Sequence, residues 1–85
     1  MIINFKKYDE YENGDYVVLK EFKSFYYHIV KIIEYEFVYT RVKSFNLKTG
    51  EDSDFWIKPE MIDRKATPEE IEEIKIIKNA LKYNL

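Results

Sequence analysis

Side chains capable of covalent catalysis are scarce in this 85-residue chain. It contains no cysteine and one histidine, His28, which directly follows Tyr26 and Tyr27. A general base needs a partner group that orients it and a pocket for its substrate, and one histidine without ligand spacing indicates neither catalysis nor a metal site. We therefore expect a structural or surface role for His28, and a protein that is not an enzyme.

An acidic cluster stands beside the second glycine of the chain. Glu51, Asp52 and Asp54 lie close together in sequence, but their spacing lacks the twelve-residue loop and terminal glutamate of an EF-hand. Gly14 and Gly50 are the only glycines, so no phosphate-cradling loop is present. Paired carboxylates of the glycosidase kind need only lie close in space, and the sequence leaves that chemistry open. We expect a solvated hairpin tip, no metal and no cofactor.

Cationic and aromatic side chains alternate through the middle of the chain. Residues 20–48 carry six basic groups against three acids, although the formal net charge of the whole chain is −2. Successive side chains of a strand point to opposite faces. A strand over 37–47 therefore turns its even positions, beginning with Val38 and Thr40, toward the core and its odd positions toward solvent or a partner. With one tyrosine from the preceding strand, the candidate binding residues are Tyr26, Tyr39, Arg41, Lys43 and Phe45.

Two kinds of binding fit this mixture of side chains. Tyrosine and arginine are enriched at the energetic centres of protein interfaces, and the eight tyrosines of so small a domain cannot all be buried with satisfied hydroxyls. Aromatic and cationic groups together also form platforms for single-stranded nucleic acids, where they stack on bases and attract phosphates. We expect a non-enzymatic protein-binding module, with a single-stranded nucleic-acid-binding barrel as the alternative. Ordinary strand alternation on a scaffold gives the same pattern.

The distribution of aromatic residues indicates the elements that position these side chains. Fourteen of the fifteen aromatic residues lie between Phe5 and Trp56, in a stretch patterned like β-strands. Turn-forming or polar residues divide it at 13–15, at 34–36 and at 48–53. The predicted strands are 16–22, 26–34, 37–47 and 54–58.

A helix is predicted for the C-terminal part of the chain. Thr67 suits the N-cap, Pro68 suits the first helical position, and Glu70 completes a capping box three residues after the cap. Apolar residues then recur at steps of three and four, so they line one helix face with one lysine stem at its margin. The residues of this face are Ile71, Ile74, Ile77, Lys78 and Leu81.

The connection between sheet and helix is short. Pro59 ends the last strand because proline cannot donate to a central ladder, a single helical turn is expected at 60–63, and 64–66 forms a joint. We expect one structural unit of mainly β (α+β) class. Its sheet and an N-terminal extension occupy 1–63, and its helix occupies 64–85.

The sequence contains no pattern typical of secretion or membrane insertion. No apolar run approaches the roughly 20 residues of a membrane span, and the apolar stretch from Met1 to Phe5 is too short for a signal peptide. The absence of cysteine excludes disulfide scaffolds and thiolate zinc sites. We expect a cytoplasmic protein without a membrane partner.

The order of these elements resembles a small SH3-like barrel over about 13–63. A Gly-Asp turn opens an apolar strand, a long hairpin follows, and a short Trp-containing strand is closed by Pro59 and one helical turn. Residues 13–18 are similar to the first strand of bacterial and phage KOW- or Tudor-like barrels, and residues 28–33 are similar to the second. The glycine common in the KOW second strand is missing, so the ligand-binding residues of that family cannot be assigned to individual positions of this chain. The resemblance implies a small SH3-like antiparallel barrel with a C-terminal α-helix.

The segment from Arg64 to Ile71 is similar to tails of small phage and mobile-element proteins. This resemblance implies a host-directed adaptor or inhibitor, for example of a defence nuclease, acting in the host cytoplasm. An uncovered edge strand can pair with its own copy, so a homodimer is a further expected form.

Overall fold

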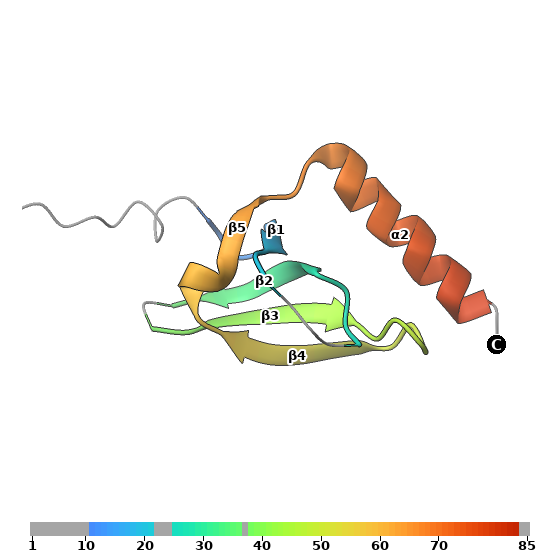
Figure 1. Cartoon of the computed structure of the whole chain (residues 1–85), viewed down its shortest axis with the longest axis horizontal. Coiled ribbons are helices and arrows are strands. Elements are labelled where there is room, and N and C mark those ends of the chain that lie inside the picture. Colours follow the sequence, from blue (N-terminus) through green and yellow to red (C-terminus); the bar gives the residue numbers. More distant parts are fainter. Residues whose placement is uncertain (1–10, 22–24, 37, 84–85) are drawn as a thin grey trace, which may run out of the picture.

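The protein consists of a five-stranded antiparallel sheet followed by one helix (Figure 1). The computed structural model describes residues 11–21, 25–36 and 38–83. Most of the predicted N-terminal extension and the end of the predicted first strand lie outside the described residues. The elements in chain order are β1 (Tyr16–Leu19), β2 (Ile29–Tyr35), β3 (Thr40–Phe45), β4 (Asp52–Ile57), the 3-10 turn η1 (Pro59–Met61), β5 (Ile62–Lys65) and α2 (Pro68–Tyr83).

The strands lie in the order β4-β3-β2-β1-β5, and every neighbouring pair is antiparallel. The central hairpin places Lys31 opposite Lys43 and Ile32 opposite Val42, with an irregularity before Glu34. The sheet is not closed into a barrel among the described residues, so β4 and β5 are its edges. The predicted mainly β (α+β) class with a C-terminal helix is confirmed.

The strand β5 was not predicted from the sequence. Residues 62–65 pair with β1, with Val17 opposite Lys65 and Val18 opposite Arg64, whereas we expected a helical turn at 60–63 and a joint at 64–66. The helical turn lies slightly earlier, at η1. Of the four β5 residues only Ile62 is buried, so this strand lacks the apolar alternation from which a strand is predicted.

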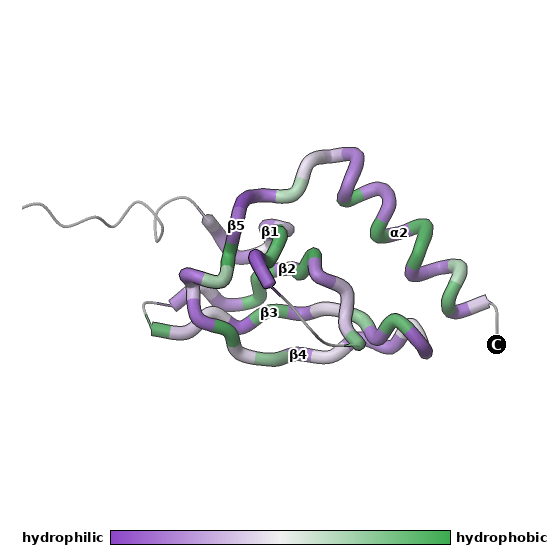
Figure 2. Tube along the Cα trace, viewed as in Figure 1, coloured by the Kyte–Doolittle hydropathy of each residue, from purple (hydrophilic) through white to green (hydrophobic). Residues whose placement is uncertain are grey.

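Apolar side chains cover both faces of the sheet. On the inner face, β1, β2, β3, β4 and β5 together form one core cluster, which contains Tyr11, Val17, Leu19, Val30, Ile32, Val42, Ile57 and Ile62. On the opposite face, called here the helix-side face, Val18, Ile29 and Phe45 pack against Ile74 of α2. Hydrophobic and hydrophilic segments alternate along α2 (Figure 2), as expected for a helix that buries one side.

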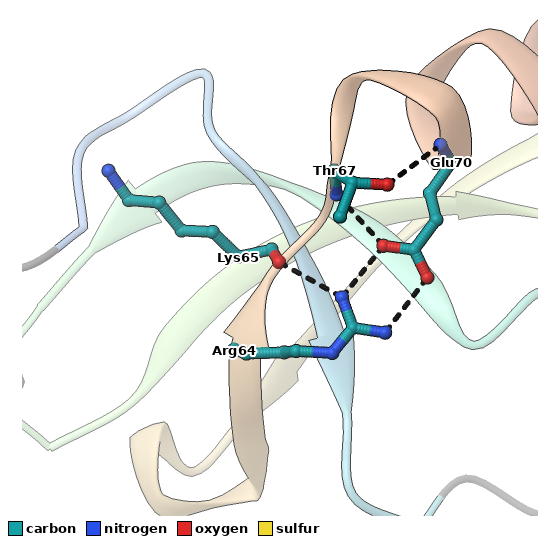
Figure 3. Close-up of polar contacts among 4 residues, drawn as sticks. All are labelled: Arg64, Lys65, Thr67 and Glu70. Atoms are coloured by element: carbon teal, nitrogen blue, oxygen red, sulfur yellow. Dashed lines mark hydrogen bonds and ion pairs between the residues drawn. The ribbon is translucent and has the colours of Figure 1, made fainter.

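The start of α2 is held by the predicted capping box (Figure 3). The Thr67 hydroxyl accepts a hydrogen bond from Glu70 N–H at 3.2 Å, and the Glu70 carboxylate accepts one from Thr67 N–H at 2.8 Å. Arg64 on β5 donates two further hydrogen bonds to the same carboxylate, at 2.7 and 2.9 Å. The last strand and the helix start are thus joined through one side chain.

The other end of α2 lies against the loop between β3 and β4. Gly50 in this loop has φ of +77°, a conformation that residues with a side chain rarely adopt, and an added Cβ would lie 3.3 Å from Leu81 Cβ. A glycine therefore permits both the turn and the close approach of the helix. No helix in the described part of the chain is both long and apolar enough to cross a membrane.

Thr40 supplies a test of the inner core. Its side chain is fully buried, and its hydroxyl has no hydrogen-bond partner within the described part of the chain. Because a buried hydroxyl without a partner is unfavourable, Thr40→Val should raise the free energy of unfolding by about 1 kcal/mol in urea titrations. Ser44→Ala is the matched control and should lower it by about 1 kcal/mol, because the Ser44 hydroxyl donates to Tyr27 O at 2.9 Å. A loss of stability in Thr40→Val would contradict this assignment.

Glu70 supplies a test of the helix start. Hydrogen bonds from Arg64, and then from Thr67, lower the pKa of Glu70 from 4.5 to about 2. A carboxylate whose pKa is lower in the folded state stabilises that state above about pH 4.5 and loses this effect as the pH falls toward 2. Glu70→Gln should therefore lower the melting temperature at pH 7, and the difference from the wild type should shrink between pH 4.5 and 2.

The control for Glu70 is another acid of the same helix. Glu72 is exposed and forms no ion pair with any described residue, so Glu72→Gln should leave the melting temperature almost unchanged. Equal losses in the two variants at pH 7 would exclude a specific role for the Arg64–Glu70 contact.

Candidate functional site

The structure separates the five candidate binding residues onto different surfaces. Tyr26 lies on the inner-face side, where its hydroxyl is 3.1 Å from Ser53 Oγ and its ring is 5.6 Å from the ring of Phe55. Arg41, Lys43 and Phe45 belong to the helix-side face of β3, as strand alternation requires. Tyr26 therefore does not share a surface with the β3 residues.

The predicted exposure of Phe45 is wrong. Its side chain is only 3 % exposed, because α2 covers this end of the helix-side face. The ring of Phe45 stacks on Tyr27 with centroids 5.1 Å apart and an angle of 26°. The alternation of β3 was predicted correctly, but the sequence did not indicate that a distant helix packs on the odd positions.

Arg41 is engaged in ion pairs across the strands. Its guanidinium donates to Glu34 on β2 at 3.1 Å and to Asp54 on β4 at 2.7 Å. Hydrogen bonding to Glu34 and then to Asp54 raises the pKa of Arg41 above its ordinary value. The side chain is about one-third exposed, so it acts first as a link between three strands.

Tyr39 and Trp56 are the exposed aromatic residues next to Arg41 on β3 and β4. Tyr39 is 48 % exposed just before β3, and Trp56 is 52 % exposed on β4, directly opposite Arg41. Trp56 was expected only as part of a strand. Its position on an edge strand, beyond the reach of α2, leaves its ring exposed.

A groove lies on the helix-side face, where α2 meets the sheet. Its volume is about 150 Å³, similar to an engineered protein cavity that accommodates benzene. The strands β1, β2, β3 and β4 contribute one wall and α2 contributes the other. The lining residues are Tyr16, Ile29, Lys31, Lys43, Ser44, Phe45, Asp52, Ile74, Lys75 and Lys78.

The groove combines an apolar floor with a cationic rim. Ile29, Phe45 and Ile74 are nearly fully buried at its base, and four lysines against one aspartate give the lining a formal charge of +3. Lys78 pairs with Asp52 at 2.6 Å. Within the described part of the chain, the other three lysines form no ion pair. The rim is therefore a set of available cations in a chain whose formal net charge is −2.

Two of the candidate residues, Lys43 and Phe45, line this groove, and Arg41 lies next to it on β3. Three further lining residues, Tyr16 of β1, Lys31 of β2 and Lys75 of α2, were not predicted as site residues from the sequence. Two signals in the sequence pointed to the rim, namely Lys43 on the odd face of the predicted strand 37–47 and Lys78 at the margin of the apolar helix face.

The other side chains that could act in catalysis or metal binding have ordinary surroundings. His28 is exposed, and its ring lies 4.7 Å from that of Tyr27. Asp52 and Asp54, from the acidic cluster expected at a solvated hairpin tip, instead lie on β4, where they pair with Lys78 and Arg41. The described residues contain no group of three or more histidine, cysteine or acidic side chains that could hold a metal ion.

Comparisons with known proteins found no relative. No protein-family model, no curated protein and no solved structure matches this chain.

Phe45 supplies a test of the packing beneath the groove. Phe45→Ala should lower the free energy of unfolding by about 3–5 kcal/mol, because it removes a buried ring between sheet and helix. Tyr39→Ala is the matched control, and its effect should stay within about 0.5 kcal/mol because the side chain is exposed. Urea unfolding of the two variants measures both values, and equal losses would place Phe45 outside the core.

Proposed function

We propose that this protein is a protein-binding module that takes an acidic segment of its partner into the groove between the sheet and α2. The observation that carries the proposal is the cationic rim on an apolar floor. Three lysines without ion pairs among the described residues surround a space suited to one apolar side chain. A segment with carboxylates on both sides of a Leu, Ile or Phe complements both features.

Charge complementarity favours an anionic partner in particular. The chain as a whole carries a formal net charge of −2, whereas the residues that line the groove carry a formal charge of +3. Opposite charges on two binding surfaces raise the association rate and select among partners more than they add to affinity. The interaction should therefore weaken at high salt, because exposed charges are screened over about 8–10 Å at physiological ionic strength.

The apolar floor favours a peptide over a nucleic acid. Single-stranded nucleic acids bind largely by stacking bases on exposed aromatic faces, but the ring of Phe45 already stacks on Tyr27. The ring of Tyr16 lies beneath Lys31, whose Nζ is 5.9 Å from its centroid. An aliphatic or aromatic side chain of a peptide needs no such open face and only has to fill the space.

The resemblances found in the sequence give a more specific form of the proposal. The order of the strands and the 3-10 turn between β4 and β5 are those expected from the resemblance to small SH3-like barrels of the KOW or Tudor-like kind, but the sheet is open among the described residues. In that form the protein is a small phage-type adaptor or inhibitor. It would bind a host protein, such as a defence nuclease, in the host cytoplasm.

Fluorescence anisotropy with three labelled probes tests the proposal. The probes are a peptide with glutamates around one leucine, the same peptide with lysines in place of the glutamates, and an oligothymidylate of similar length. At low salt we expect binding of the acidic peptide alone, with affinity falling as sodium chloride is raised. Stronger binding of the oligothymidylate would replace the proposal by the nucleic-acid alternative.

Charge reversal locates the binding surface. Lys43→Glu combined with Lys75→Glu should weaken binding of the acidic peptide at least about tenfold, since two attractive contacts become repulsive. Lys20→Glu combined with Lys82→Glu changes the net charge equally on exposed residues outside the groove, and it should change the affinity less than about threefold. Equal effects of the two pairs would show a non-specific charge interaction and reject the groove as the site.

A further inference from the structure

The outer edge of β4 has free backbone hydrogen-bonding groups. In an antiparallel pair, opposite residues alternate between those that exchange hydrogen bonds and those that do not. Asn46 N–H donates to Glu51 O at 2.8 Å, and the register continues from this pair along β3 and β4. The N–H and C=O groups of Asp52, Asp54 and Trp56 therefore point away from β3.

Nothing in the described part of the chain hydrogen-bonds to that edge. Figure 1 shows β4 at the lower margin of the sheet, and α2 comes near this strand only through its C-terminal part, where Lys78 pairs with Asp52. An open edge of this kind can accept another strand unless charges or prolines prevent it.

The two acids of β4 are compensated within the chain. Asp54 binds Arg41 at 2.7 Å, and Asp52 binds Lys78 through Oδ1 at 2.6 Å. Like charges directly opposite each other destabilise strand pairing, but here each carboxylate already has a cation beside it. The electrostatic protection expected of an acidic edge strand is thereby reduced.

We infer that β4 pairs antiparallel with β4 of a second copy of this chain, with Phe55 opposite Phe55 of that copy. The sequence is complementary to itself in this register. Lys58, which is exposed and extended, stands opposite Asp52 of the second copy, and the symmetry generates the same pair again. The second carboxylate oxygen of Asp52 can accept this contact while Oδ1 keeps Lys78.

The same register gives Trp56 a partner. It stands opposite Asp54 of the second copy, whose carboxylate is held by Arg41. The half-exposed Trp56 indole then covers the Arg41–Asp54 ion pair of the second copy. A guanidinium close to the face of a tryptophan ring is attracted by that ring. A register shifted by two residues in one direction places Asp54 opposite Asp54 of the second copy. A shift in the other direction places Trp56 opposite Trp56 of the second copy. Neither of these pairs Asp52 with Lys58.

Sedimentation velocity over a series of protein concentrations tests the inference. The wild type should associate to a dimer, and Asp54→Pro should be monomeric because it removes an outward N–H at a position where an edge strand tolerates proline. Circular dichroism checks that this variant keeps its fold. A wild type that stays monomeric at every concentration would overturn the inference.

Charge exchange tests the register itself. Lys58→Glu and Asp52→Lys should each weaken self-association at least about tenfold, because two attractive cross-strand pairs become repulsive. An equimolar mixture of the two variants should recover association, since each heterodimer contains only opposite pairs. The control Lys20→Glu, at an exposed residue outside β4, should associate like the wild type. Absence of recovery in the mixture, with both variants folded, would overturn the register.

Should Asp52→Lys fail to fold, Lys58→Glu remains decisive. Mixed with the wild type, it should give an affinity between those of the two pure proteins, because the heterodimer keeps one attractive pair. Association of pure Lys58→Glu equal to that of the wild type would overturn the proposed pairing. A dimer of this kind is independent of the groove, although Asp52 borders both surfaces.

Discussion

The structure depends on a sheet that is apolar on both faces. Burial of apolar surface is the main favourable term in folding, and a sheet with Val17, Val30 and Val42 on one side and Val18, Ile29 and Phe45 on the other needs cover on each. On the inner face, Tyr11 from the segment before β1 and Met61 of η1 pack against the strand residues. The helix-side face depends on α2, which buries one residue, Ile74, almost completely among the strands. The position of the groove on the helix-side face depends on how far α2 covers the strands.

Two local devices hold α2 in position against the sheet. At its start, Arg64 and Glu70 join the last strand to the capping box, and at its end Gly50 allows Leu81 to approach the loop between β3 and β4. Held at both ends, α2 covers the part of the helix-side face that contains Val18, Ile29 and Phe45. The uncovered part begins at Lys43 and Arg41, and the groove lies at this boundary.

The distribution of charge follows from the same arrangement. The two acids of β4 form ion pairs with Arg41 and Lys78. The other three lysines at the groove have no carboxylate partner among the described residues. Lysine stems pack on apolar surface while their ammonium groups stay in water, so a rim of lysines above an apolar floor is stable in the unbound protein. The same neutralisation makes the edge of β4 less repulsive to a second strand.

The sequence by itself determined the local elements. Thr67, Pro68 and Glu70 predicted the start of the helix, because a capping box needs only residues three positions apart, and the strand tract with its polar turns predicted the central hairpin. It did not indicate β5, whose outward residues are polar. It also could not decide which odd positions of β3 are exposed, since Phe45 and Lys43 have equivalent places in the alternation. Only the tertiary structure separated them. The cover over Phe45 comes from Ile74, twenty-nine residues further along the chain, and no local pattern records where a distant helix packs.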